Sequence, residues 1–90
     1  MYHKEGMEIL VHPKFRKSLR KLPTRIQEMA RVKIDQFLSY PNHAALHVHK
    51  LELSVGDRWS FWVSYEYRII FEIADKIIIL HDIGTHDIYE

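Results

Sequence analysis

The sequence predicts an α+β fold of the order β-αα-ββββ, with one face of a curved antiparallel sheet covered by an N-terminal helical hairpin. Two observations predict it. Apolar residues recur about every 3.6 positions in the first half of the chain and about every two positions in the second half. The whole chain, residues 1–90, is also long enough for one domain and too short for two. Its 47% hydrophobic and 28% charged residues are ordinary values for a globular protein.

The first strand and the first helix are predicted from a short apolar run and a proline. Met7–Val11 lies between Gly6 and Pro13, which is typical of a strand. Pro13 suits the first turn of a helix because its missing N–H is not needed there. One apolar stripe follows at the spacing i, i+4, i+7, formed by Phe15, Leu19 and Leu22. Pro23 ends this helix.

A second helix is expected to begin at Thr24. The Thr24 hydroxyl can cap the free amides, and Gln27 stands three residues later, as a capping box requires. Pro41-Asn42 ends the helix. Its predicted buried face consists of Ile26, Met29, Ala30, Ile34, Phe37 and Leu38. Almost no loop separates the two helices, so we expect them to form a hairpin.

Four further strands are predicted, over Leu46–Leu53, Arg58–Tyr65, Tyr67–Ala74 and Ile77–Ile83. Short turns join them, which favours an antiparallel meander. The first strand must join the same sheet, because a lone strand cannot satisfy its backbone. The face away from the helices is expected to be an open, concave groove.

The charges are segregated along the chain although the net charge is only +1. Between His12 and Asp35 there are eight lysines and arginines and two acids, so the helical half is basic and the remainder is acidic. A basic element in a small domain indicates contact with a polyanion. The alternative is a solvated helix face that keeps the protein soluble.

Several function classes are excluded or disfavoured. The absence of cysteine excludes disulfides, thiolate zinc sites and a cysteine nucleophile. His47 and His49 would share one strand face, but no third ligand follows at a suitable spacing, so we predict no metal or other cofactor. The first six residues lack the apolar core of an export signal. The longest apolar run, Ile77–Leu80, is too short for a membrane span. We therefore expect a cytoplasmic protein that does not contact membranes.

Three side chains are candidates for chemistry. Arg68 lies within an otherwise apolar strand, where a guanidinium suits phosphate contact or reaches solvent and pairs with Glu66 or Glu72. His86 follows the last strand and can exchange a proton near neutral pH, although it is also compatible with an ordinary surface loop. Tyr89 can stack on a nucleobase or pack onto the core.

In four blocks the chain resembles the RelE/ParE toxins. Ile9–Pro23 is similar to their opening segment, and Leu46–Leu53, with Lys50-Leu51, to their usual strand entry. Trp59–Phe71 looks like the central block of the YoeB-like branch. Ile79–Tyr89, with Gly84-Thr85-His86, looks like the tail of YafQ- and RelE-like members. The blocks cover nearly the whole chain in the order that the family has.

This resemblance implies a microbial RNase-like fold and the toxin half of a type II toxin–antitoxin pair, with a cognate antitoxin protein as partner. Many members enter the ribosomal A site and cut the bound mRNA without a metal. The ribose 2′-hydroxyl attacks the adjacent phosphate and leaves a 2′,3′-cyclic phosphate. Such a reaction needs a base, a cation for the phosphorane and an acid for the leaving oxygen.

Matched by position, the resemblance makes Arg68 the transition-state arginine, His86 the acid and Tyr89 the aromatic against the mRNA base. It makes His49, or less directly His47, the base. The expected RNA contacts are Lys50, Arg58, Arg20 and Lys21. The sequence departs from the family where Trp59 and Phe61 replace strand lysines and Trp62 replaces a strand arginine. The glutamate base of the YoeB-like branch has no clear match, although Glu52 lies nearby.

Two other functions share this fold and stay open at the level of sequence. A ParE-like inhibitor of DNA gyrase acts by protein–protein contact and needs no acid–base set. A degenerate member binds its antitoxin and does little else.

Overall fold

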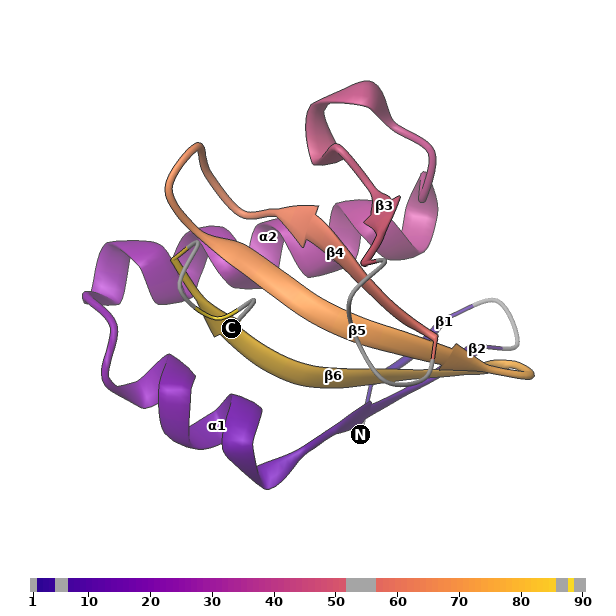
Figure 1. Ribbon diagram of the computed structural model, residues 1–90, viewed down its shortest axis with the longest axis horizontal. Helices are drawn as coiled ribbons and strands as arrows, with labels where there is room; N and C mark the ends of the chain where they lie inside the picture. The colour runs from indigo at the N-terminus through magenta and orange to yellow at the C-terminus, as the bar shows by residue number, and fades with distance from the viewer. Residues whose placement is uncertain (1, 5–6, 52–56, 86–87, 89–90) are drawn as a thin grey trace.

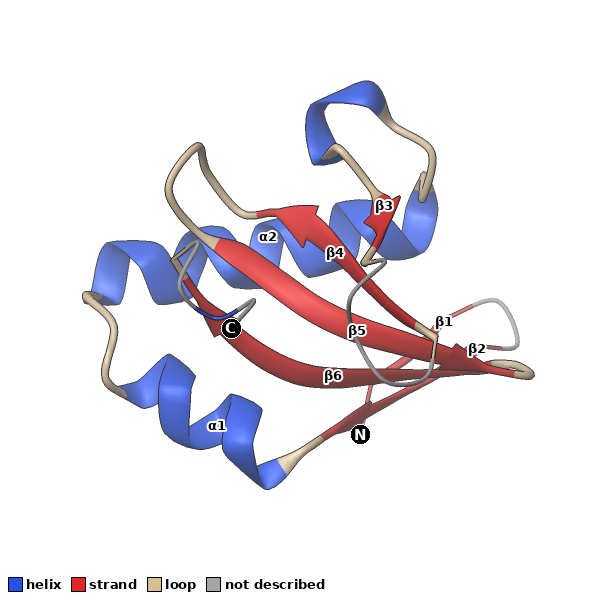
Figure 2. Ribbon diagram, in the orientation of Figure 1, coloured by secondary structure: helices blue, strands red, loops and turns tan. Residues whose placement is uncertain are grey.

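The computed structural model describes residues 2–4, 7–51, 57–85 and 88 (Figures 1 and 2). Along the chain the elements are β1 (Tyr2–Lys4), β2 (Met7–Val11), α1 (Pro13–Arg20), α2 (Thr24–Ser39), the 3₁₀ helix η1 (Ala44–Leu46), β3 (His49–Lys50), β4 (Arg58–Trp62), β5 (Arg68–Ala74) and β6 (Ile77–Gly84). No helix in these ranges is long and apolar enough to cross a membrane.

The strands form one mixed sheet in the order β1-β2-β6-β5-β4-β3. The meander β3 to β6 is antiparallel, as predicted. β2 joins the same sheet beside β6, in the register Ile9↔Ile78 to Val11↔Leu80, and β1 pairs with the outer edge of β2. The α+β prediction is therefore confirmed. The expectation of an antiparallel sheet is wrong for one pairing, because β2 and β6 are parallel. Apolar alternation identifies the faces of a strand and not its direction.

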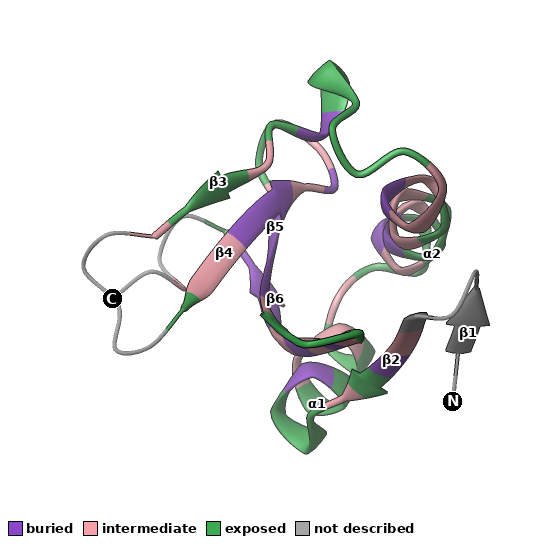
Figure 3. Ribbon diagram, turned by 90° about the vertical axis from the view of Figure 1, so that its right-hand side faces the viewer, coloured by how far each residue is buried: buried purple, intermediate pink, exposed green. Residues whose placement is uncertain are grey.

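The two helices meet the sheet in different ways. α2 lies across one face of the sheet, whereas α1 lies beside the second half of β6, where β2 has ended (Figures 1 and 3). The His12 amide, just before α1, donates to the Leu80 carbonyl at 2.9 Å. Both helices contribute to one core. At its centre the Phe37 ring of α2 stacks on Phe61, with ring centroids 4.8 Å apart and planes 9° apart.

The ends of the helices depart from the predicted capping. The His12 side chain caps α1, because its Nδ1 accepts the Lys14 amide at 3.0 Å. α2 has no side-chain cap, and its N-cap residue is Pro23. The predicted capping box at Thr24 is wrong: Thr24 is already helical, and the Gln27 side-chain amide donates back to the Leu22 carbonyl at 2.9 Å. The tight link between the helices brings that carbonyl within reach.

The predicted strand Leu46–Leu53 is largely wrong within the described residues. η1 places Leu46 in the core, where it is fully buried. His47 then takes a left-handed backbone conformation, with φ 50°, and only His49–Lys50 pairs as a strand. His47 and His49 therefore do not share a strand face. The need to bury Leu46 overrides the alternation of the segment.

The face opposite α2 is called the second face below (Figure 3). Cross-strand partners share a face. The rows of this face are Trp62–Arg68–Gly84, Ser60–Ile70–Asp82 and Arg58–Glu72–Ile79. A β-bulge at Ile70/Phe71 leaves His81 as an extra residue of β6. The expected open groove is wrong for the centre of this face, because the whole middle row, Ser60–Ile70–Asp82, is buried, as is Arg68 in the row beside it.

Candidate functional site

Arg68 begins β5 on the second face and is 4% exposed. Its Nη1 donates to the carbonyls of Ser64 at 2.7 Å, Tyr65 at 2.6 Å and Tyr67 at 3.3 Å. The guanidinium carbon also lies 4.2 Å from the centre of the Trp62 ring. A buried cation needs such partners to offset its lost hydration. Neither Glu66 nor Glu72 pairs with Arg68 among the described residues, so the carbonyls replace the ion pair that the sequence suggested as an alternative.

These contacts fix the turn between β4 and β5. The Val63 and Ser64 amides donate to the Tyr67 carbonyl at 2.9 and 3.3 Å. The Tyr67 amide in turn donates to the Ser64 hydroxyl at 3.3 Å. Arg68 adds its bonds from inside the turn. The backbone of Ser64–Tyr67 is therefore held at several points, although the turn itself projects from the sheet (Figure 1).

Trp62 joins Arg68 to the segment that precedes β3. The His47 ring stacks on it, with centroids 3.6 Å apart and planes 23° apart. Tyr65 meets the same indole edge-on, at 5.9 Å and 89°. A guanidinium, an imidazole and a phenol thus contact one indole ring. Cations and aromatic edges both favour the face of an indole.

His49 lies on the same face, opposite Ser60. Its Nδ1 is 3.0 Å from the His47 carbonyl, which only accepts, so Nδ1 carries the proton. In the neutral ring Nε2 then holds the lone pair, and the Ser60 hydroxyl donates to it over 3.4 Å. His49 is exposed. An exposed imidazole with a fixed tautomer is equipped to accept a proton.

Gly84 pairs with Arg68, and two of the residues that follow it, Thr85 and Ile88, are described. The Ile88 amide donates to the Thr85 carbonyl at 3.1 Å. The Ile88 side chain fills the space beside Gly84, since a Cβ there would lie 2.3 Å from Ile88 Cγ2. The predicted acid His86 and the predicted stacking residue Tyr89 lie outside the described residues, so their predicted roles stay predictions.

The four predicted RNA contacts fall into two groups. Lys50 Nζ is 3.3 Å from Asp57 Oδ1, and Arg58 Nε is 3.9 Å from Glu72 Oε1, so both cations are paired with acids. Arg20 and Lys21 are exposed at the end of α1, where Arg20 Nε donates to the Arg16 carbonyl at 3.3 Å. Neither forms an ion pair with a described residue. Of the four, only these two cations at the end of α1 therefore have no acidic partner among the described residues.

Sequence reasoning missed two parts of this face. The sequence does not decide the register of β4, so it does not place Trp62; pairing with β5 puts Trp62 on the second face and Trp59 against the core. The sequence also gives no sign of the contact between His81 and Glu72, in which His81 Nε2 lies 2.9 Å from Glu72 Oε1. The bulge that creates this contact has no local sequence signal.

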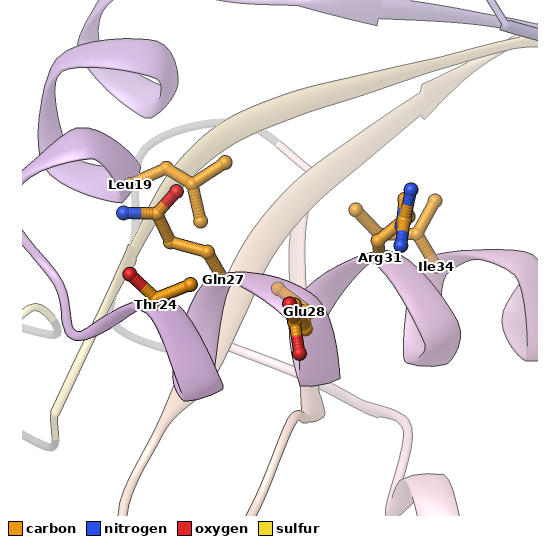
Figure 4. Close-up of a pocket in the computed structure, with 7 residues that line it drawn as sticks. Leu19, Thr24, Gln27, Glu28, Arg31 and Ile34 are labelled. Carbon is orange, nitrogen blue, oxygen red and sulfur yellow. The ribbon is translucent and has the colours of Figure 1, made fainter.

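A separate groove of about 450 Å³ lies between the two helices (Figure 4). Leu19 of α1 faces the first turns of α2, and Arg31 and Ile34 lie further along α2. Together with these residues, the lining consists of Thr24, Gln27, Glu28 and Ala30. The groove has an apolar floor and a charged rim, and it belongs to a different surface from that of Arg68.

No protein-family model and no curated protein matches the sequence. Solved structures do match the fold. A chain of the archaeal RelE–RelB complex from Pyrococcus horikoshii OT3 superposes with a TM-score of 0.72 at 22% identity, covering 90% of this chain and 96% of that one. A chain of the E. coli DinJ–YafQ toxin–antitoxin complex gives 0.78 at 17%, covering 93% and 97%. The YoeB/ParE toxin from Agrobacterium tumefaciens gives 0.72 at 13%, covering 89% and 99%. The chain therefore has the fold of the RelE/ParE toxins.

Proposed function

We propose that this protein is the toxin of a type II toxin–antitoxin pair and that it cuts mRNA in the ribosomal A site without a metal. One observation carries the proposal: Arg68 and His49 lie on the same face of the sheet, where Arg68 lies over the Trp62 ring and His47 stacks on that ring. A cation for the phosphate and a base for the 2′-hydroxyl are thus provided on one surface.

The chemistry assigns one role to each group. His49 Nε2 takes the proton of the ribose 2′-hydroxyl, and the 2′-oxygen attacks the adjacent phosphorus. The charge of Arg68 stabilises the phosphorane, because no carboxylate of the described residues neutralises it. The bond from phosphorus to the 5′-oxygen then breaks, and His86 protonates that oxygen. The products are a 2′,3′-cyclic phosphate and a 5′-hydroxyl, with Tyr89 stacked on the mRNA base.

The approach of RNA is assigned to α1. The exposed cations at the end of this helix, Arg20 and the C-cap residue Lys21, attract the phosphate backbone of RNA at long range. Lys50 follows the proposed base His49 in β3, and Arg58 lies at the end of the second face away from Arg68; each already has an acidic partner. They contribute to the position of the RNA more than to the strength of its binding.

The test is single-turnover cleavage of mRNA on programmed ribosomes. The wild-type protein should cut within the A-site codon, and His86→Ala should slow cleavage by about 10²-fold or more, as for loss of a general acid. An unchanged rate would remove His86 from the mechanism. A DNA supercoiling assay runs in parallel. If gyrase stalls while ribosomal mRNA stays intact, the nuclease proposal fails and gyrase inhibition replaces it.

The antitoxin is proposed to place an acidic, amphipathic segment in the groove between α1 and α2 (Figure 4). Leu19, Ala30 and Ile34 offer apolar contact, and Arg31 offers a cation at the rim. In co-expression with the product of the adjacent gene, Arg31→Glu should weaken the complex by about tenfold, as for a charge reversal at an interface. Arg25→Glu, on the same helix but outside the groove, is the matched control. Absence of any stable complex with the wild-type protein argues against this partner.

A further inference from the structure

Tyr65 is the most exposed large aromatic side chain among the described residues. It is 75% exposed at the tip of the β4–β5 turn. Its backbone is nevertheless fixed, because its carbonyl accepts Arg68 Nη1 at 2.6 Å and the turn is closed by the bonds of Val63, Ser64 and Tyr67. The turn uses the backbone of Tyr65 and not its ring. An aromatic ring on a rigid support loses little conformational entropy on binding.

The surroundings of the ring indicate what it binds. Tyr65 contacts the Trp62 ring edge-on, and Trp62 carries the Arg68 guanidinium. Ring and guanidinium are therefore adjacent, as a base and its phosphate are adjacent in one nucleotide. Two exposed side chains of opposite charge, Glu66 in the turn and Arg25 of α2, line one pocket with Tyr65, so no net charge at this point attracts a phosphate. The ring itself offers a flat face, which suits an uncharged, planar group.

We propose that Tyr65 is a nucleobase-stacking subsite: it binds an unpaired base of the RNA whose neighbouring phosphate lies near Arg68, and it favours purines because they have the larger π-surface. This inference rests on the proposed function and adds a specificity residue to it. According to this proposal, the β4–β5 turn selects the nucleobase next to the cleavage site.

The test uses the full chain and a short single-stranded RNA with one 2-aminopurine and a 2′-O-methyl group at the cleavable position. Stacking on a tyrosine should quench the 2-aminopurine fluorescence of the bound RNA. Tyr65→Ala should weaken binding by about tenfold, as for loss of one stacked base, and should abolish the quenching. Tyr65→Phe keeps the ring and should bind within about twofold of wild type. Tyr40→Ala is the matched control, since Tyr40, the residue that follows the C-terminal end of α2, is 68% exposed.

Each outcome bears on one claim. Any of three results overturns the subsite. Tyr65→Ala binds the RNA as tightly as the wild type, Tyr65→Ala and Tyr65→Phe lose the same affinity, or the wild type does not bind the RNA. Cleavage mapped on programmed ribosomes separates the two proposals. If the wild type cuts before purines preferentially and Tyr65→Ala loses that preference, both stand. If binding depends on Tyr65 but no mRNA is cut, the nuclease proposal fails while the subsite stands.

Discussion

The second face has two arginines that differ in whether a carboxylate neutralises the charge of the guanidinium. Arg58, at one end, lies 3.9 Å from Glu72, whose carboxylate also contacts His81 at 2.9 Å. Arg68, at the other end, is more deeply buried, yet its partners are backbone carbonyls and an indole ring. Carbonyls satisfy the hydrogen-bonding of a guanidinium without cancelling its charge. The positive potential of this face therefore persists at Arg68 and is neutralised at Arg58.

This difference distinguishes an arginine that is available for chemistry from one whose role is structural. A cation that is held by dipoles is preorganised to stabilise new negative charge. A cation that is paired with a carboxylate would first have to give up that partner. The Arg58–Glu72–His81 cluster therefore holds three strands together, and the Arg68 end of the face carries the proposed chemistry.

The largest expected effect comes from removing Arg68. Arg68→Ala leaves the carbonyls of Ser64, Tyr65 and Tyr67 without their donor, so the free energy of unfolding should fall by about 3 kcal/mol. Cleavage should fall by about 10³-fold or more. Arg58→Ala should cost about 1 kcal/mol or less, because its ion pair is partly exposed. Urea denaturation and single-turnover cleavage measure the two quantities. Equal losses of stability and cleavage in Arg68→Ala and Arg58→Ala would show that the two ends of the second face do not differ in function.

Because Arg68→Ala changes both fold and charge, Arg68→Lys is the informative companion. Lysine keeps the charge but lacks the planar group that stacks on Trp62 and reaches several carbonyls. Stability near that of wild type with cleavage still strongly reduced would assign the guanidinium to the phosphate. Full activity in Arg68→Lys would show that charge alone is required.

Two histidines of the face, His49 and His81, should differ in the same way. His49→Ala should slow cleavage by about 10²-fold with little change in stability, since the side chain is exposed and acts as the proposed base. His81→Ala should leave cleavage within a few-fold of wild type and cost about 1 kcal/mol for its lost bond to Glu72. Single-turnover rates and denaturation curves give both numbers. If His81→Ala slows cleavage more than His49→Ala does, the general base is His81, at the other end of the face.

Much of the fold, but only part of this contrast, could be predicted from the sequence. Met7–Val11 and the start of β6 at Ile77 were placed correctly because an apolar run bounded by turn residues is a local signal. The break of the first helix before Pro23 was equally local. The segment at His47 was misplaced, because its left-handed turn depends on the burial of Leu46 and on Trp62, which lies far along the chain.

The candidate site shows the same limit. Arg68 was singled out because an arginine in an apolar strand is costly. Its partners could not be foreseen, since three carbonyls converge only once the β4–β5 turn is formed. The tautomer of His49 likewise depends on the His47 carbonyl, whose position follows from a backbone conformation that the sequence did not predict.

An intermediate effect is expected at Gly84, the partner of Arg68. A Cβ in Gly84→Ala would meet Ile88 Cγ2 at 2.3 Å, so the chain after Gly84, which carries the proposed acid His86, must shift. Cleavage should fall by about tenfold, since displacement of a catalytic group by about 1 Å is costly. Gly84→Ala/Ile88→Ala removes the obstructing atom and should recover most of the rate. A double variant no better than Gly84→Ala would show that the contact with Ile88 is not what matters.

The smallest effect compares two lysines at the edge of the proposed RNA path. Lys50 carries its own counterion in Asp57, whereas Lys21 forms no ion pair with a described residue. A lysine that neutralises a phosphate releases condensed counterions, so Lys21→Ala should lower the slope of log affinity against log salt by up to about one. Lys50→Ala should change the slope less, because Lys50 already has Asp57 as its counterion and therefore releases fewer condensed counterions when RNA binds. Binding of the 2′-O-methyl RNA across a salt series measures both slopes. If Lys50→Ala changes the slope more than Lys21→Ala, Asp57 does not screen Lys50. In that case the presence or absence of an acid partner would not indicate which cations contact the RNA.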